Sequence, residues 1–201
     1  MQTLIFIRSV YAEEITPLRL SILSNLVIPA WKAQTDSDFK LIILCHETTL
    51  PVLKTLDWGD LKVKFVKCFT HGLNMIRKNK EYQQLVSKKD TIQIRYDDDD
   101  YPHPDFIRFV HAQFTANDKL ELVTFHPTKH VLETGAKYYS QTKWYSANKP
   151  SNCVAIKNNK GIGIFEDDHS QMGKYFREKI FIKVFKFHNM TIHSENILNE
   201  A

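Results

Sequence analysis

Short apolar runs recur along the first half of the chain, and polar residues bound each of them. Four runs have the length and the β-branched composition of buried strands: residues 3–8, 39–45, 61–66 and 91–96. The stretches between them carry apolar residues at helical spacing. Strands that alternate with helices predict βαβ units, and therefore a mostly parallel central sheet flanked by helices, the α/β fold class.

Prolines mark the expected helix starts. Thr16 and Pro17 suit the N-cap and the first position of a helix. Pro29 lacks the N–H that a helix interior needs, so it predicts a break and a second short helix over residues 29–35. After Pro104, a further helix is expected to bury one apolar face, made of Phe106, Ile107, Val110 and Phe114.

From residue 120 the pattern changes to hairpins. Strands are expected over 121–125 and 179–187. Two hairpins are expected, one over 129–141 with a turn at Thr134–Gly135 and one over 153–165. The second half is therefore predicted to add a mixed or antiparallel β extension. Because no linker or repeat divides the 201 residues, we expect a single domain over 1–201, with halves 1–118 and 119–201.

Composition narrows the class of protein. With 43% hydrophobic and 25% charged residues and only short apolar runs, the chain reads as an ordinary globular protein without a transmembrane segment. The N-terminus lacks the basic region of a signal peptide, so we expect a cytoplasmic location. Three cysteines without a CxxC argue against a disulfide framework and a zinc site. A net charge of +4 is only weak evidence for binding to nucleic acid. It could equally attract a phosphorylated metabolite or the surface of an anionic membrane.

Four consecutive aspartates, Asp97 to Asp100, follow the strand at 91–96. Two carboxylates about 7 Å apart repel by roughly 2 kcal/mol at an effective dielectric constant near 20. A solvated turn or a bound divalent cation could offset this cost. If the backbone stays extended, Asp97 and Asp99 point the same way, and such an Asp-x-Asp pair can hold a hard cation.

Two segments resemble one protein family. The stretch "RYDDDDYPHPDFI" and the earlier "RLSILSNLVIPAWKAQTDSDFKLIIL" are similar to two blocks of the rhamnosyltransferase-like glycosyltransferases, in the same order. Weaker similarity continues through "HSQM" and "IHSEN". Ala30 and Asp98 depart from the family pattern, where serine is more common at both positions, but the Asp-x-Asp motif is intact.

The resemblance implies the glycosyltransferase A fold and transfer of a sugar from a nucleotide-sugar donor to an acceptor hydroxyl. It implies Mn²⁺ or Mg²⁺ held by Asp99 and Asp97, with Asp97 contacting either the metal or the ribose. A late histidine would complete the metal site, with His193 as first choice and His169 as second. Arg95 could brace these carboxylates, or it could form a simple structural ion pair. Residues 1–118 would then bind the nucleotide sugar and 119–201 the acceptor, which could be a glycan, lipid-linked or a small molecule.

A direct displacement with inversion needs a general base. Asp167 is the leading candidate, followed by Asp168 and then Asp100, although acidic residues at 166–168 could equally favour a following helix. Since the nucleotide usually lies across the ends of the first two strands in this fold, Arg8, Ser9 and Glu47 are the expected contacts.

Two other functions use the same residues. The carboxylates could serve a two-metal phosphodiester or phosphate hydrolase. The chain could also be a non-catalytic nucleotide-binding or sugar-binding module of the same fold. Metal binding by Asp99 and turnover by Asp167 separate these possibilities.

Overall fold

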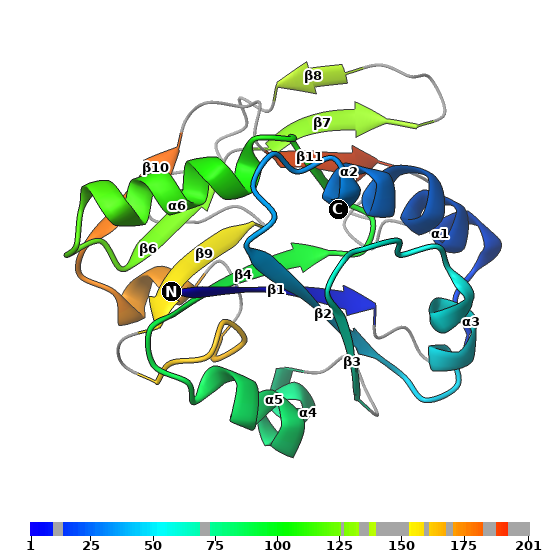
Figure 1. Ribbon diagram of the computed structural model, residues 1–201, viewed down its shortest axis with the longest axis horizontal. Helices are drawn as coiled ribbons and strands as arrows, with labels where there is room; N and C mark the ends of the chain where they lie inside the picture. The colour runs from blue at the N-terminus through cyan, green and yellow to red at the C-terminus, as the bar shows by residue number, and fades with distance from the viewer. Residues whose placement is uncertain are drawn as a thin grey trace.

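A seven-stranded sheet runs through the middle of the molecule, with helices on both of its faces (Figure 1). The computed structural model describes residues 1–9, 14–68, 73–125, 127–132, 137–139, 153–158, 161–167, 171–182 and 188–192. The four strands expected in the first half all form and pair in parallel: β1 (Gln2–Ser9), β2 (Phe39–Cys45), β3 (Val63–Lys67) and β4 (Thr91–Asp97). The predicted α/β class is therefore confirmed.

The strand order is β10-β6-β9-β4-β1-β2-β3. From β1 the chain moves outward through β2 to β3, and it then returns to place β4 on the other side of β1. In open α/β sheets, ligands bind beyond the carboxyl ends of the strands at such a reversal of order. The topology therefore points to the ends of β1 and β4 as the place for a site.

The second half extends this sheet and adds a smaller one. β9 (Val154–Asn158) lies antiparallel between β4 and β6 (Leu122–Phe125), and β10 (Lys179–Ile182) pairs in parallel with β6. The smaller sheet has the order β5-β11-β7-β8. Its strands are β5 (Tyr101–Pro102), β7 (Pro127–Val131), β8 (Lys137–Tyr139) and β11 (His188–Ile192). The expected mixed extension is present.

In one of the two predicted hairpins, the second strand does not form. β7 and β8 pair antiparallel as expected, although the Thr134–Gly135 turn lies outside the described residues. Residues 161–165, by contrast, form no strand. The N–H of Ile164 donates to Gln93 Oε1 at 3.0 Å, and that of Phe165 donates to Tyr82 Oη at 3.1 Å. Side chains thus take the hydrogen bonds that a strand partner would have used.

The helical stretch after Pro17 continues through Pro29. α1 (Pro17–Ile22), a π-helical turn η1 (Leu23–Val27) and α2 (Ile28–Lys32) follow one another directly. In the π turn, the N–H of Ile28 donates to the carbonyl of Leu23, five residues back. The wider turn accommodates the proline ring, which would clash in a regular α-helix. The predicted second short helix forms as α2, with Pro29 in its first turn, but the expected break before it is absent because the π turn joins α1 to α2. Thr16 is the N-cap as expected and accepts from the N–H of Arg19.

Both faces of the main sheet are covered. α1, η1, α2 and α6 (Phe106–Ala116) lie on one face, where the fully buried Trp31 packs against Tyr96 and Phe106 with ring centroids 5.2 and 6.2 Å apart. α4 (Leu73–Lys78) and α5 (Lys80–Val86) cover the other face, where Phe6, Tyr82 and Phe165 pack edge to face.

The helical elements not yet described are short. The longer helix α6 has the buried face that the sequence predicts. α3 (Leu50–Thr55) follows β2, and η3 (Met172–Tyr175) is a single 3-10 turn. On α6, all four residues of the expected apolar face are buried. Within the part of the chain that the structure describes, no helix has the length and apolarity needed to cross a membrane.

Candidate active site

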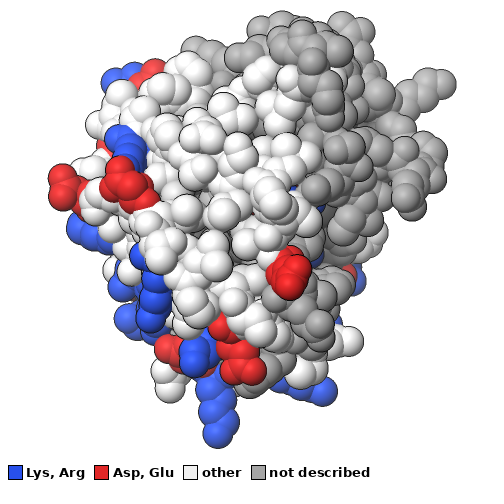
Figure 2. Space-filling view, turned by 90° about the vertical axis from the view of Figure 1, so that its right-hand side faces the viewer, with Lys and Arg blue, Asp and Glu red and all other residues white. Residues whose placement is uncertain are grey.

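The four aspartates form a tight turn at the reversal point of the strand order. β4 ends at Asp97, the N–H of Asp100 approaches the carbonyl of Asp97 at 3.3 Å, and β5 begins at the next residue. Because this is a turn, the strict alternation expected for an extended backbone stops at Asp97. The face toward which β1 and β4 point is mostly uncharged where the structure describes it (Figure 2). This agrees with exposures of only 2%, 7% and 1% for Asp98, Asp99 and Asp100.

Two arginines offset the repulsion within this turn, so solvent exposure is not what stabilises it. Arg8 is the register partner of Asp97 across β1 and β4, and its Nη2 lies 3.6 Å from Asp97 Oδ1. Arg19, on α1, is buried and donates from Nη1 to Asp98 Oδ1 at 2.9 Å. Its Nη2 lies 3.6 Å from Asp99 Oδ2.

The charge balance around Asp98 is unusual for a carboxyl group. Burial and the neighbouring Asp99 carboxylate raise the pKa of Asp98, although Arg19 acts to lower it. A single guanidinium therefore does not fully compensate the carboxylates packed at this position. Such crowding of negative charge below the surface is what a site for a cation requires.

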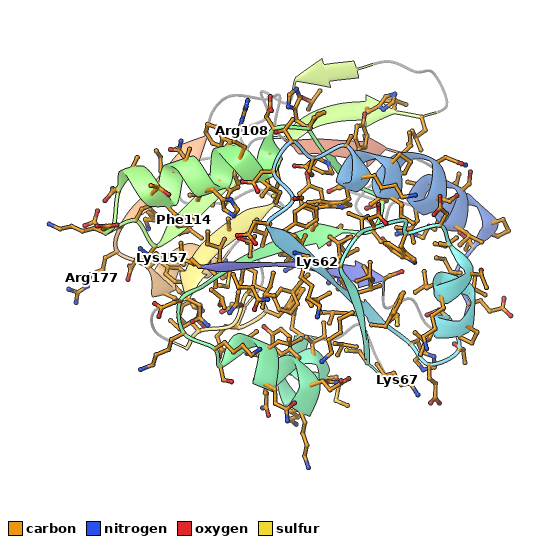
Figure 3. The ribbon with its side chains drawn as sticks, in the orientation of Figure 1. Lys62, Lys67, Arg108, Phe114, Lys157 and Arg177 are labelled. Atoms are coloured by element: carbon orange, nitrogen blue, oxygen red, sulfur yellow. The ribbon has the colours of Figure 1, made fainter. Side chains whose placement is uncertain are left out.

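The two sequence blocks that carry the family resemblance contact each other here. Gln34 Nε2 donates to the carbonyl of His103 at 2.8 Å, and its Oε1 accepts from the N–H of Ile107 at 3.1 Å. The hydroxyl of Thr35 donates to Asp105 Oδ1, which also pairs with the exposed Arg108 on the outer side of α6 (Figure 3). The end of α2 thus fixes the segment that follows the acidic turn.

The residues expected to bind the nucleotide lie at different depths. Arg8 and Ser9 end β1 beside the acidic turn, and Ser9 is close enough to Asp98 to favour its charged form. Glu47 is exposed in the turn between β2 and α3. Arg95 is buried two residues before Asp97, and its guanidinium lies over the ring of Phe165, 5.2 Å from the centroid. Arg8 and Ser9 therefore lie next to the aspartates. Glu47 follows the neighbouring strand β2, and Arg95 lies in β4, before the turn.

The leading candidate for the base sits in a polar cluster. Asp167 Oδ2 accepts from the hydroxyl of Tyr175 at 3.1 Å and pairs with Lys174. This ion pair raises the pKa of Lys174, chiefly through its hydrogen bond to Asp167. The segment that leads to Asp167 lies against β4, because Phe165 contacts Arg95. The other candidate from this run, Asp168, falls outside the described residues.

The donor atoms of the acidic turn fit a hard divalent cation. Asp97 and Asp99 offer carboxylate oxygens, and their side chains are 18% and 10% exposed. Among the residues that the structure describes, no group of three or more His, Cys, Asp or Glu side chains is arranged to hold a metal. The two histidines expected as further ligands, His169 and His193, lie outside that part of the chain.

β11 lies alongside β5, the strand that follows the acidic turn. It pairs antiparallel with β5, so that His188 is opposite Pro102 and Asn189 is opposite Tyr101. The strand therefore runs back along β5 in the direction of Asp100.

Arg19 belongs to this site but was not predicted from the sequence. A signal was available, because Arg19 stands three and four residues before Ile22 and Leu23, both of which are buried. A charged residue on the apolar face of a helix needs a buried partner. The aspartates were the obvious acidic partners.

Comparisons with known proteins find a family and solved structures of similar fold. A family model described as "Putative rhamnosyl transferase" matches residues 6–197. No curated protein matches the sequence.

Among solved structures, the chain is similar to S. aureus TarS 1-349 in complex with UDP-GlcNAc, with a TM-score of 0.68 and 9% identity over 100% of this chain and 61% of that one. It is also similar to the complex of the same protein with UDP, with a TM-score of 0.64 and 9% identity over 96% and 61% of the two chains. A third likeness is to 4-diphosphocytidyl-2C-methyl-D-erythritolsynthase from Anaerococcus prevotii, with a TM-score of 0.51 and 11% identity over 98% and 91%. The chain spans about three fifths of TarS 1-349. These likenesses confirm the expected glycosyltransferase A-like fold.

Proposed function

Because this chain belongs to the rhamnosyl transferase family, we propose that it is a glycosyltransferase that moves a sugar from a nucleotide-sugar donor to an acceptor hydroxyl. One observation carries the proposal: a buried acidic turn, paired with Arg8 and Arg19, stands at the carboxyl ends of β1 and β4, where the strand order reverses. Ligands of open α/β sheets bind at this place. Two of the TarS structures that share the fold are complexes, one with UDP-GlcNAc and one with UDP, which supports a nucleotide-sugar donor.

The donor would lie across the ends of β1 and β4. Arg8 is 26% exposed, and its 3.6 Å contact with Asp97 is longer than a hydrogen bond, so the guanidinium is free to turn to a diphosphate. Ser9, Glu47 and Arg95 are the further residues proposed for the nucleotide side, with Asp97 reaching either the ribose or the metal.

We assign the metal to Asp97 and Asp99, with His193 or His169 as a further ligand. Mn²⁺ or Mg²⁺ at this position would neutralise the charge that develops on the diphosphate when the glycosidic bond breaks. The chain's own contribution is to hold two carboxylates at the opening of a buried turn, where the surrounding protein strengthens their attraction for a cation.

For the acceptor we propose that Asp167 removes the hydroxyl proton in a direct displacement with inversion. Tyr175 and Lys174 would orient its carboxylate. Asp168 and Asp100 are the alternatives for this role. The acceptor would be a glycan, lipid-linked or a small molecule, bound by residues 119–201, and the chain could contact a membrane surface but would not bind nucleic acid.

Isothermal titration calorimetry with UDP, GDP and dTDP, each with and without Mn²⁺, tests the donor site. We expect one of the three nucleotides to bind weakly without metal and more tightly with Mn²⁺, and Asp99→Asn to abolish this increase while keeping nearly the same shape. Asp118→Asn, a change at an exposed turn before β6, is the matched control and should bind like the wild type. If no nucleotide binds the wild type, the proposal fails.

A product assay with the matching nucleotide sugar separates transfer from the two competing functions. Asp167→Asn should bind the nucleotide normally but lose turnover. Binding without any turnover by the wild type would favour a non-catalytic module. Cleavage of a phosphodiester such as bis(p-nitrophenyl) phosphate, dependent on Asp99, would favour a hydrolase.

A further inference from the structure

We propose that Arg19 is a positioning residue that holds the metal-binding carboxylate Asp99 in place and is itself anchored by Asp98. This role rests on the proposed donor site, and it gives two adjacent aspartates separate functions. Asp99 would bind the cation, whereas Asp98 would bind the arginine and not the cation.

The guanidinium joins the two carboxylates with different strengths. Its Nη1 makes a hydrogen bond of 2.9 Å to Asp98, and its Nη2 makes a longer contact of 3.6 Å to Asp99. Because the two nitrogens have a fixed spacing in a planar group, the short bond to Asp98 determines where the second nitrogen faces Asp99. The arginine therefore transmits the position of the anchored carboxylate to the neighbouring one.

Burial indicates which carboxylate is the anchor. The side chains of Arg19 and Asp98 are 6% and 2% exposed, whereas that of Asp99 is 10% exposed. Breaking a buried ion pair leaves an uncompensated buried charge, so the Arg19–Asp98 pair is expected to persist. The longer contact to Asp99 can lengthen without breaking the buried pair.

The location of Arg19 adds a link between two elements. It lies in the first turn of α1, where the hydroxyl of Thr16 accepts from its backbone N–H at 3.3 Å. The N-cap therefore fixes the backbone of the same residue whose side chain fixes the acidic turn. The arginine therefore ties the acidic turn to the start of α1.

Arg19→Lys tests the geometry separately from the charge. A lysine keeps the positive charge, but its single ammonium group does not present two nitrogens at a fixed spacing. Arg108→Lys, at the exposed arginine that pairs with Asp105, is the matched control. The binding of Mn²⁺ alone is measured from the electron paramagnetic resonance signal of the free ion, and that of UDP without metal by calorimetry.

We expect Arg19→Lys to weaken Mn²⁺ binding by about tenfold, the lower end of the loss seen when a residue that orients a metal ligand is removed. UDP binding without metal should not change, and Arg108→Lys should match the wild type in both measurements. A merely structural role would instead weaken both kinds of binding together, and this result would contradict the proposal.

Asp98→Asn provides a second variant that preserves the volume of the buried side chain. Without the anchoring charge, Arg19 should move toward Asp99 and compete with the cation, so Mn²⁺ binding should again weaken. Unchanged Mn²⁺ binding by both variants overturns the role of Arg19 and leaves the donor site standing. Absence of Mn²⁺ binding by the wild type overturns the donor site itself, and the positioning role with it.

Discussion

Gln34 offers a sharp test of how the segment after the acidic turn is held. Its Nε2 donates to the carbonyls of Ala30 and His103 at 3.1 and 2.8 Å, and its Oε1 accepts from the N–H of Ile107 at 3.1 Å. Gln34→Glu keeps the size and the accepting oxygen but replaces the donor by an oxygen that faces two carbonyls. The change therefore removes two hydrogen bonds and adds repulsion at one half-buried point.

The expected loss follows from these contacts. Each of the two donated hydrogen bonds contributes about 1 kcal/mol, and repulsion adds to their loss, so the free energy of unfolding should fall by about 2–3 kcal/mol. For a protein of this size, this corresponds to a decrease of roughly 4–12 °C in the melting temperature. The favourable position of a negative charge near the start of α6 offsets a few tenths of a kcal/mol.

Urea unfolding at several pH values measures this loss, with Gln84→Glu, at an exposed position of α5, as the control. The facing carbonyls should raise the pKa of the introduced carboxyl, because they favour its protonated form. The deficit relative to the wild type is then complete at neutral pH and shrinks as the pH falls through this raised pKa. If Gln34→Glu and Gln84→Glu are equally stable at pH 7, Gln34 does not hold the segment.

Two further changes test the packing around the sheet. Burial alone would raise the pKa of Asp36, but hydrogen bonds from a backbone N–H and from His111 outweigh it and lower the pKa below 3.8. The stability contributed by the charged form, about 0.5–1 kcal/mol, is present above pH 3.8 and is lost as the pH falls through the lowered pKa, so the gap between wild type and Asp36→Asn in denaturant titrations should close in acid. Gly163→Ala would place a Cβ less than 3.0 Å from the buried hydroxyl of Tyr82 and should cost about 1–3 kcal/mol, whereas Gly173→Ala meets only a lysine tip at 3.8 Å and should leave the melting temperature unchanged. Equal melting temperatures for the two alanine variants would contradict the close packing at Gly163.

Local patterns in the sequence were sufficient for most of the framework. The runs at 39–45 and 91–96 became β2 and β4 almost residue for residue, because β-branched residues between polar boundaries leave few alternatives. The buried face of α6 was predicted in full because its apolar residues recur at helical spacing. The position of the aspartates at a strand end was also evident from the sequence alone.

The errors arose where a distant partner decided the local structure. Residues 161–165 alternate like a strand, yet their N–H groups bond to Gln93 and Tyr82, which lie far away in sequence. Pro29 reads as a helix break, but packing of the surrounding helix on the sheet favours a π turn that keeps the helix continuous. A single sequence contains no direct signal for the distant contacts that decide the structure of these two segments.

The sequence by itself determined which residues carry charge and in what order, and hence that four carboxylates stand in a row at the end of β4. Only the tertiary structure decided that Asp98, Asp99 and Asp100 are buried, because burial depends on α1, which precedes them by some eighty residues and supplies Arg19. It likewise decided that Arg8 faces Asp97, since this contact follows from the register of β1 against β4. Charge is a property of each residue, whereas its compensation depends on which elements pack together.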